Sequence, residues 1–127
     1  MIKYLLSIAI AALISSNLLG QNILVNEVYS AVLCEDGTVY SSGGDADLQN
    51  ESSGGSFLFR KVNAVENVKS IGGAVGSGNI LFLLKDKTLV AAGNNFFGAL
   101  GTGTVIGGKV SYLPVLGLTD IVEVSTS

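Results

Sequence analysis

The chain has 127 residues, 48% of them hydrophobic, with no histidine, one cysteine and a formal net charge of −3. Because phosphate binding needs clustered lysine and arginine, this acidic balance argues against nucleic acid as a partner. A single cysteine excludes an intrachain disulfide, and the absence of histidine removes the commonest general base and metal ligand. We therefore expect no enzyme activity, no cofactor and no metal site, and we interpret Cys34 as a buried, inert thiol.

The N-terminus has the layout of a secretory signal peptide. Lys3 precedes an apolar run over residues 4–14, which polar residues 15–17 interrupt. The run is shorter than the roughly 20 apolar residues that a membrane-spanning helix needs. We predict that residues 1–20 form a signal-peptide helix, cleaved after Gly20, and that the protein is secreted or extracellular, in the periplasm or at the cell surface in some settings. An uncleaved anchor is the alternative interpretation.

The remainder of the chain repeats itself. Residues 36–43 recur as residues 86–93 at an offset of 50, residues 31–34 correspond to residues 81–84, and the opening at residues 67–71 returns at residues 120–124. Self-similarity at such a period is typical of repeat architectures. We predict a first, degenerate repeat over residues 21–66, a second repeat over residues 67–119 and the start of a third over residues 120–127.

Each repeat contains short runs rich in β-branched and aromatic residues, bounded by Gly, Asn, Asp and Ser, which predict strands. The Asp36-Gly37 pair predicts a tight hairpin turn, and Asp86-Lys87 holds the same place without the glycine. Residues 109–116 predict an outer strand, while the glycine-rich stretches 72–78 and 101–108 predict connections. A repeat of about 50 residues with four short strands favours an all-β fold, a partial β-propeller of about two four-stranded blades behind the signal helix.

The stretch that begins at Gly93 resembles the signature of the regulator of chromosome condensation repeat family, to which inhibitors of secreted β-lactamases are similar. The matching positions are Gly93, Asn95, Gly98, Leu100, Gly101 and Gly103, whereas Ala99 stands where the family usually has glutamine. The first repeat keeps only the leading Gly43. The resemblance implies a propeller of about seven blades in a complete member, with these residues in structural roles.

Three further sequence patterns resemble functional motifs, and each has an alternative interpretation without a specific function. Gly103, Gly108 and Lys109 have the spacing of a phosphate-binding P-loop, but Val110 replaces the required hydroxyl, which favours a blade loop. Residues 45–51 alternate carboxylates as a calcium loop does, yet lack its turn glycine, which favours a solvated acidic loop. Asn50 lies in an Asn-Glu-Ser glycosylation acceptor sequence, which matters only in a eukaryotic secretory route.

Phe96 and Phe97 follow the second repeat's hairpin, where they would either anchor a partner or pack against the next blade, the interpretation that the sequence favours. We expect a secreted repeat protein that binds a protein or other macromolecule, as part of a longer chain. The alternatives are a guanine-nucleotide exchange factor or chromatin-type regulator, as in the family's namesake, and a cell-surface repeat protein without its C-terminal anchor. Two blades cannot close a ring, so we also expect self-association through unpaired blade faces.

Overall fold

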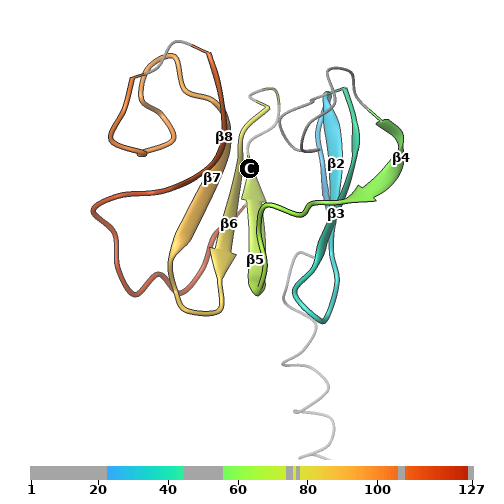
Figure 1. Ribbon diagram of the computed structural model, residues 1–127, viewed down its shortest axis with the longest axis horizontal. Coiled ribbons are helices and arrows are strands. Elements are labelled where there is room, and N and C mark those ends of the chain that lie inside the picture. Colours follow the sequence, from blue (N-terminus) through green and yellow to red (C-terminus); the bar gives the residue numbers. More distant parts are fainter. Residues whose placement is uncertain (1–22, 45–55, 74–75, 77, 106–107, 126–127) are drawn as a thin grey trace, which may run out of the picture.

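The protein folds into two four-stranded antiparallel sheets. The computed structural model describes residues 23–44, 56–73, 76, 78–105 and 108–125. Sheet 1 contains β1 (Ile23–Val25), β2 (Tyr29–Leu33), β3 (Val39–Gly43) and β4 (Ser56–Lys61), and sheet 2 contains β5 (Val68–Gly73), β6 (Ile80–Leu84), β7 (Leu89–Asn94) and β8 (Lys109–Pro114). In both sheets the strands lie in chain order (Figure 1). The all-β prediction is confirmed, since no helix occurs in the described residues.

The central hairpin of each sheet is closed in the same way. In sheet 1 the Asp36 carboxylate accepts hydrogen bonds from the Thr38 amide at 2.9 Å and the Thr38 hydroxyl at 2.7 Å. In sheet 2 the Asp86 carboxylate accepts the corresponding bonds from Thr88 at 3.0 and 2.6 Å. Both turns that the sequence predicts are therefore present, because the aspartate side chain fixes the backbone two residues ahead of it.

The connections to the following strands also repeat. The Val62 amide donates to the Val39 carbonyl at 2.8 Å, and the Val115 amide donates to the Leu89 carbonyl at 2.9 Å. Each of these bonds holds the chain that leaves an outer strand against the start of the third strand of its own sheet. The similarity between the two halves of the sequence thus extends from residue types to individual backbone hydrogen bonds.

The two sheets share one core. β5 packs against β1 and β2, and a single cluster of buried side chains contains Leu24, Ala31 and Leu33 from sheet 1 with Ile71 and Phe82 from sheet 2. Burying these apolar side chains is the main stabilising contribution between the sheets. A polar contact accompanies it: the Tyr29 hydroxyl donates a hydrogen bond of 2.9 Å to the Asn79 carbonyl.

One predicted connection is wrong. Gly72 and Gly73 belong to β5, although the glycine-rich stretch 72–78 was expected to be a loop. The reason is close packing: a Cβ on Gly73 would lie 2.7 Å from the Asn79 carbonyl oxygen, and one on Gly72 would lie 3.1 Å from the Val124 Cβ. Glycine inside a strand is typical of places where another backbone approaches closely.

Lys109 begins β8, so the stretch from Gly103 continues into a strand and not into the helix that a P-loop requires. This strand ends at Pro114, two residues earlier than expected. The predicted leader over residues 1–20, the acidic loop over residues 45–51 and Asn50 lie outside the described residues. Among the residues that the structure describes, no helix is long and apolar enough to cross a membrane.

Candidate protein-binding loop

From Asn94, the last residue of β7, the chain forms a folded loop over residues 94–105 at one end of sheet 2, before β8 begins (Figure 1). It carries two neighbouring phenylalanines, of which Phe96 is 55% exposed and Phe97 is 95% exposed. Both rings face solvent in this chain, and their packing against a next blade, which the sequence favours, stays a prediction. Exposed aromatic residues on a folded loop are typical of binding surfaces, because loops held on a rigid scaffold commonly carry function.

Asn95 holds this loop together from the inside. Its amide nitrogen donates to the Thr104 carbonyl at 2.8 Å and to the Thr102 hydroxyl at 3.2 Å, and its amide oxygen accepts a bond of 3.1 Å from the Leu100 amide. The side chain is fully buried. Because buried amides are stable only when their donors and acceptors are paired, this network fixes the loop in one conformation.

Backbone turns complete the frame. The Gly98 amide donates to the Asn95 carbonyl, the Gly101 amide donates to the Gly98 carbonyl, and the Leu116 amide donates to the Gly101 carbonyl, at 2.8 to 3.1 Å. Gly98, Gly101 and Gly103 have φ angles of 70°, 66° and 76°, which lie in the left-handed region that favours glycine. These three glycines therefore shape the loop.

Leu100 attaches the loop to sheet 2. Its side chain is buried next to Ala91, and Leu81, Leu113 and Val115 pack against this pair. The loop thus rests on the face of sheet 2 opposite to the one that contacts sheet 1. Leu100 therefore has a packing role.

Gly43, the last residue of β3, and Gly93, the penultimate residue of β7, have the same φ of 125°. A Cβ on Gly43 would lie 2.6 Å from the Tyr29 Cα, and a Cβ on Gly93 would lie 2.7 Å from the Asn79 Cα, at the equivalent position. Both glycines allow a neighbouring backbone to approach. The loop that follows Gly44 in the first repeat lies outside the described residues.

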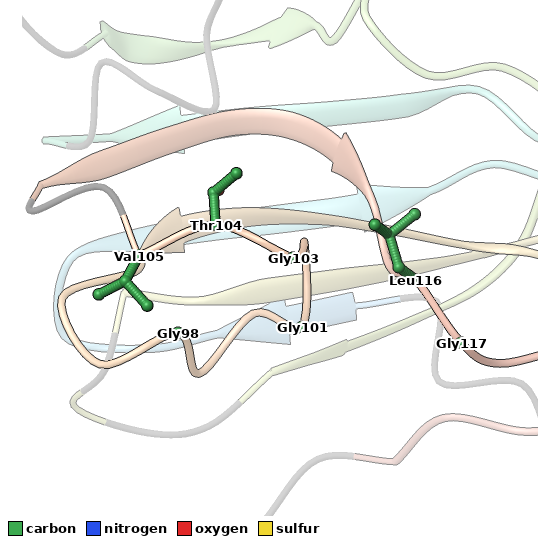
Figure 2. A pocket seen from close by; sticks show the side chains of 7 residues that line it. All are labelled: Gly98, Gly101, Gly103, Thr104, Val105, Leu116 and Gly117. Atoms are coloured by element: carbon green, nitrogen blue, oxygen red, sulfur yellow. The ribbon is translucent and has the colours of Figure 1, made fainter.

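Two open hollows adjoin the loop. One of about 280 Å³ is lined by Gly76, Asn79, Asn94, Phe96, Phe97 and Ala99. The other, of about 420 Å³, is lined by Gly98, Gly101, Gly103, Thr104, Val105, Leu116 and Gly117. In Figure 2 the Val105 and Leu116 side chains flank the glycine turns that form the floor of the second hollow.

The polar groups beside the phenylalanines are amides. The Asn94 side-chain oxygen accepts a hydrogen bond of 3.0 Å from the Phe96 amide, and the Asn79 side-chain oxygen accepts one of 2.6 Å from the Asn94 amide. Sequence reasoning did not single out Asn79 and Asn94; their only signal is an asparagine at the end of a strand. Among the described residues, those that line the two hollows carry no charge, which suits neutral, partly apolar ligand groups.

The ionisable groups with shifted pKa values lie elsewhere. Hydrogen bonds from Thr38 lower the pKa of the Asp36 carboxyl, and those from Thr88 lower the pKa of the Asp86 carboxyl. Both aspartates lie at hairpin turns and have structural roles: Asp36 lies between β2 and β3 in sheet 1, and Asp86 lies at the opposite end of β7 from Phe96. Cys34 is half-buried, so its expected full burial is not observed. Within the described ranges, no group of three His, Cys, Asp or Glu residues is placed to hold a metal ion.

No protein-family model matches this chain, and no curated protein matches it significantly.

Proposed function

We propose that this chain is an exported recognition protein built from propeller-type repeats, in which the loop over residues 94–105 binds a protein or other macromolecule. In this proposal sheets 1 and 2 are neighbouring blades, and residues 120–125 begin a third. The repeated strand order, the repeated turn contacts and the resemblance to regulator of chromosome condensation repeats support the blade assignment. The signal-peptide pattern of residues 1–20 supports export.

The observation that carries the binding role is the pair of exposed rings on a rigid loop. A phenylalanine buried at an interface removes about 150–250 Å² from water, and aromatic anchors often contribute most of a protein–protein binding energy. Phe97 is almost fully exposed although Asn95, one residue from Phe96, is fully buried and hydrogen-bonded. Binding therefore costs the loop little conformational entropy, because its backbone is already fixed before the partner arrives.

The test places a photo-crosslinking amino acid at position 97 and, as a matched control outside the loop, at position 58, where Leu58 is exposed on β4 of sheet 1. The chain is incubated with the extracellular fraction of a culture that produces it. We expect a discrete adduct from position 97 that is weaker from position 58 and is lost on Phe96→Ser. Equal labelling from both positions, or labelling that survives Phe96→Ser, would reject the binding role of the loop.

Export is tested separately. Residues 1–20 fused to a reporter enzyme should direct it out of the cytosol, whereas the same fusion carrying an aspartate pair in the apolar run should stay inside. Retention of the unaltered fusion in the cytosol would reject export of the protein, and the binding role of the loop would still stand.

A further inference from the structure

The packing of the two sheets gives each sheet two distinct faces. We define the front face of sheet 1 as the side that contacts sheet 2, where Leu24, Ala31 and Leu33 are buried. The back face of sheet 2 is the side that contacts sheet 1, where Ile71 and Phe82 are buried. Because the sheets are built alike, sheet 1 also has a back face and sheet 2 also has a front face.

Strand register identifies the back face of sheet 1 residue by residue. In sheet 2 one row across the strands contains Ile71, Phe82, Val90 and Pro114. In sheet 1 the same register gives the row Ile23, Val32, Tyr40 and Lys61. The two rows therefore occupy the same place on their respective sheets.

The environments of these equivalent rows differ. Ile71 is 1% exposed and Phe82 is fully buried, whereas Ile23 is 64% exposed and its neighbour Val25 is 63% exposed. Phe59, which lies half-exposed on β4, corresponds to Tyr112 on β8. The Tyr112 ring packs 5.7 Å from the Phe82 ring at the junction between the sheets. The back face of sheet 1 thus carries apolar residues at positions that its counterpart buries.

We propose that the back face of sheet 1 (Ile23, Val25, Val32, Tyr40 and Phe59) is a docking surface for a second copy of this chain, which presents the front face of its sheet 2. The internal junction shows what covers such a face: the front of a sheet of the same construction. On sheet 2 the same register places Gly72 and Leu81 at the positions of Leu24 and Ala31.

The front of sheet 2 is apolar but covered by the chain itself: Leu83, Leu89 and Ala91 are buried, and Leu100 of the loop packs next to Ala91. Leu118, at the position that corresponds to Val65 in the first repeat, is half-exposed, whereas Val65 is buried in the shared core. Two complementary but different faces of one chain make a head-to-tail contact, which forms closed rings or open chains of copies.

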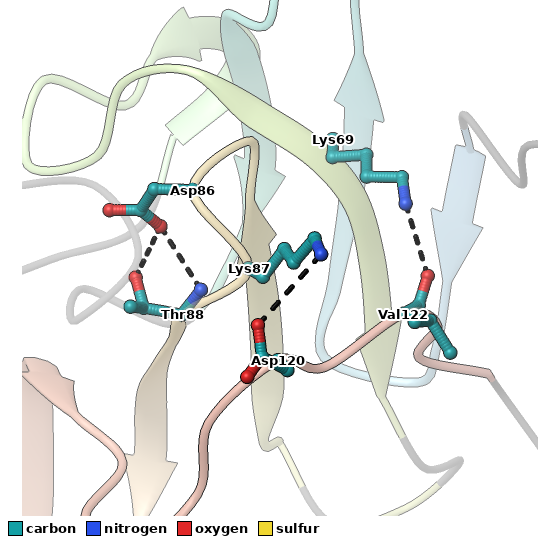
Figure 3. A network of polar contacts seen from close by, with 6 residues as sticks. All are labelled: Lys69, Asp86, Lys87, Thr88, Asp120 and Val122. Carbon is teal, nitrogen blue, oxygen red and sulfur yellow. Dashed lines mark hydrogen bonds and ion pairs between the residues drawn. The ribbon is translucent and has the colours of Figure 1, made fainter.

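Part of that front face is already occupied. The Ile121 amide donates to the Lys87 carbonyl at 3.2 Å, as the Val68 amide donates to the Gly37 carbonyl at 3.1 Å, so residues 120–125 stand where β5 stands on sheet 1. Figure 3 shows the exposed contacts that hold them: the Lys69 Nζ donates to the Val122 carbonyl at 3.1 Å, and Lys87 lies 3.8 Å from Asp120. Docking of the second copy displaces this segment, which therefore competes with it.

The experiment measures sedimentation of the purified full chain over a range of concentrations. Every variant carries the same residues 1–20, so differences in association between variants do not arise from that segment. The unaltered chain should show concentration-dependent association. The double variant Ile23→Lys with Val25→Lys should weaken association by about tenfold or more, because charges at a desolvated interface are costly. Glu35→Lys, at an exposed residue of the turn between β2 and β3, makes the net charge more positive by the same two units and should leave association unchanged.

A third variant tests the competition. Lys69→Ala removes the bond to Val122 from an exposed side chain, so it should strengthen association while circular dichroism shows an unchanged sheet content. A chain that stays monomeric at all concentrations, or association that the Ile23→Lys, Val25→Lys variant does not reduce, would overturn the proposal. The Phe96→Ser variant, which should lose crosslinking at the binding loop, should associate as the unaltered chain does. That result would show that the docking surface and the binding loop act separately.

Discussion

Gly37 and Lys87 hold the same left-handed backbone conformation at the tips of equivalent hairpins, with φ angles of 88° and 69°. Each residue accepts, through its carbonyl, a hydrogen bond from the first residue of the next inner segment, Val68 or Ile121. The glycine adopts this conformation freely, whereas a lysine side chain crowds its own backbone there. The second hairpin therefore keeps a strained residue at the point where one repeat is joined to the next.

Lys87→Gly should relieve that strain and raise the free energy of unfolding by roughly 1 kcal/mol. The ion pair with Asp120 is lost as well, but at 3.8 Å between exposed side chains it contributes little. Urea unfolding measures the change. Lys87→Ala is the matched control, since it removes the same ion pair and keeps a Cβ at positive φ, so it should bring no gain. Equal stability of the two variants would contradict the strain argument.

Asn95→Ala should lower the free energy of unfolding by about 3 kcal/mol, because it leaves the buried Leu100 amide and Thr104 carbonyl without the partners described above. Asn95→Asp keeps the acceptor for Leu100 but loses both donors, so it should also destabilise the chain. Thermal unfolding followed by circular dichroism measures both. A loss below about 1 kcal/mol for Asn95→Ala would show that water replaces the side chain and that the loop is not held by this network.

The sequence was sufficient for the features that depend on local chemistry. The hairpin turns follow from Asp36 and Asp86, and the all-β class follows from short β-branched runs between turn residues. What the sequence did not give depends on contacts between distant segments. The run of glycines around Gly72 and Gly73 predicts a loop. In the structure both residues belong to β5, where the absence of a side chain lets Asn79 and Val124 approach closely.

The phenylalanine pair also depends on distant segments. Packing of Phe96 and Phe97 against the sheet of a next blade stays a prediction, because the described residues form two sheets and the loop leaves the second of them. The buried Asn95 and the glycine turns direct the loop so that both rings face solvent. No pattern of adjacent residues encodes that direction.

Acid should weaken both hairpin turns. Hydrogen bonds from Thr38 and Thr88 hold the pKa values of the Asp36 and Asp86 carboxyls below their usual value of 3.8 in the folded chain. Their contribution to stability is therefore fully present above that value, and it disappears as the pH falls below it through the folded-state pKa values. Urea unfolding from neutral pH down to about pH 3 measures this dependence.

The matched control is Asp86→Asn together with Asp36→Asn. The asparagine oxygen still accepts the threonine hydrogen bonds but does not titrate, so the variant should lose less stability on acidification than the unaltered chain. Both carboxylates are fully exposed, and we expect a small shift of the unfolding midpoint. An equal acid dependence in chain and variant would assign the effect to other carboxyl groups.

Tyr29 lies at the junction of the two sheets, so its replacement reports on whether they unfold together. Tyr29→Phe removes the hydrogen bond from its buried hydroxyl to the Asn79 carbonyl and should lower the free energy of unfolding by about 1 kcal/mol. Tyr40→Phe is the control, since Tyr40 is exposed on the same sheet. Because the core is shared, unfolding followed at different wavelengths should give one coincident transition that shifts as a whole. Two separate transitions, with only one moved by Tyr29→Phe, would mean that the sheets fold independently and that their contact contributes little to the stability of either.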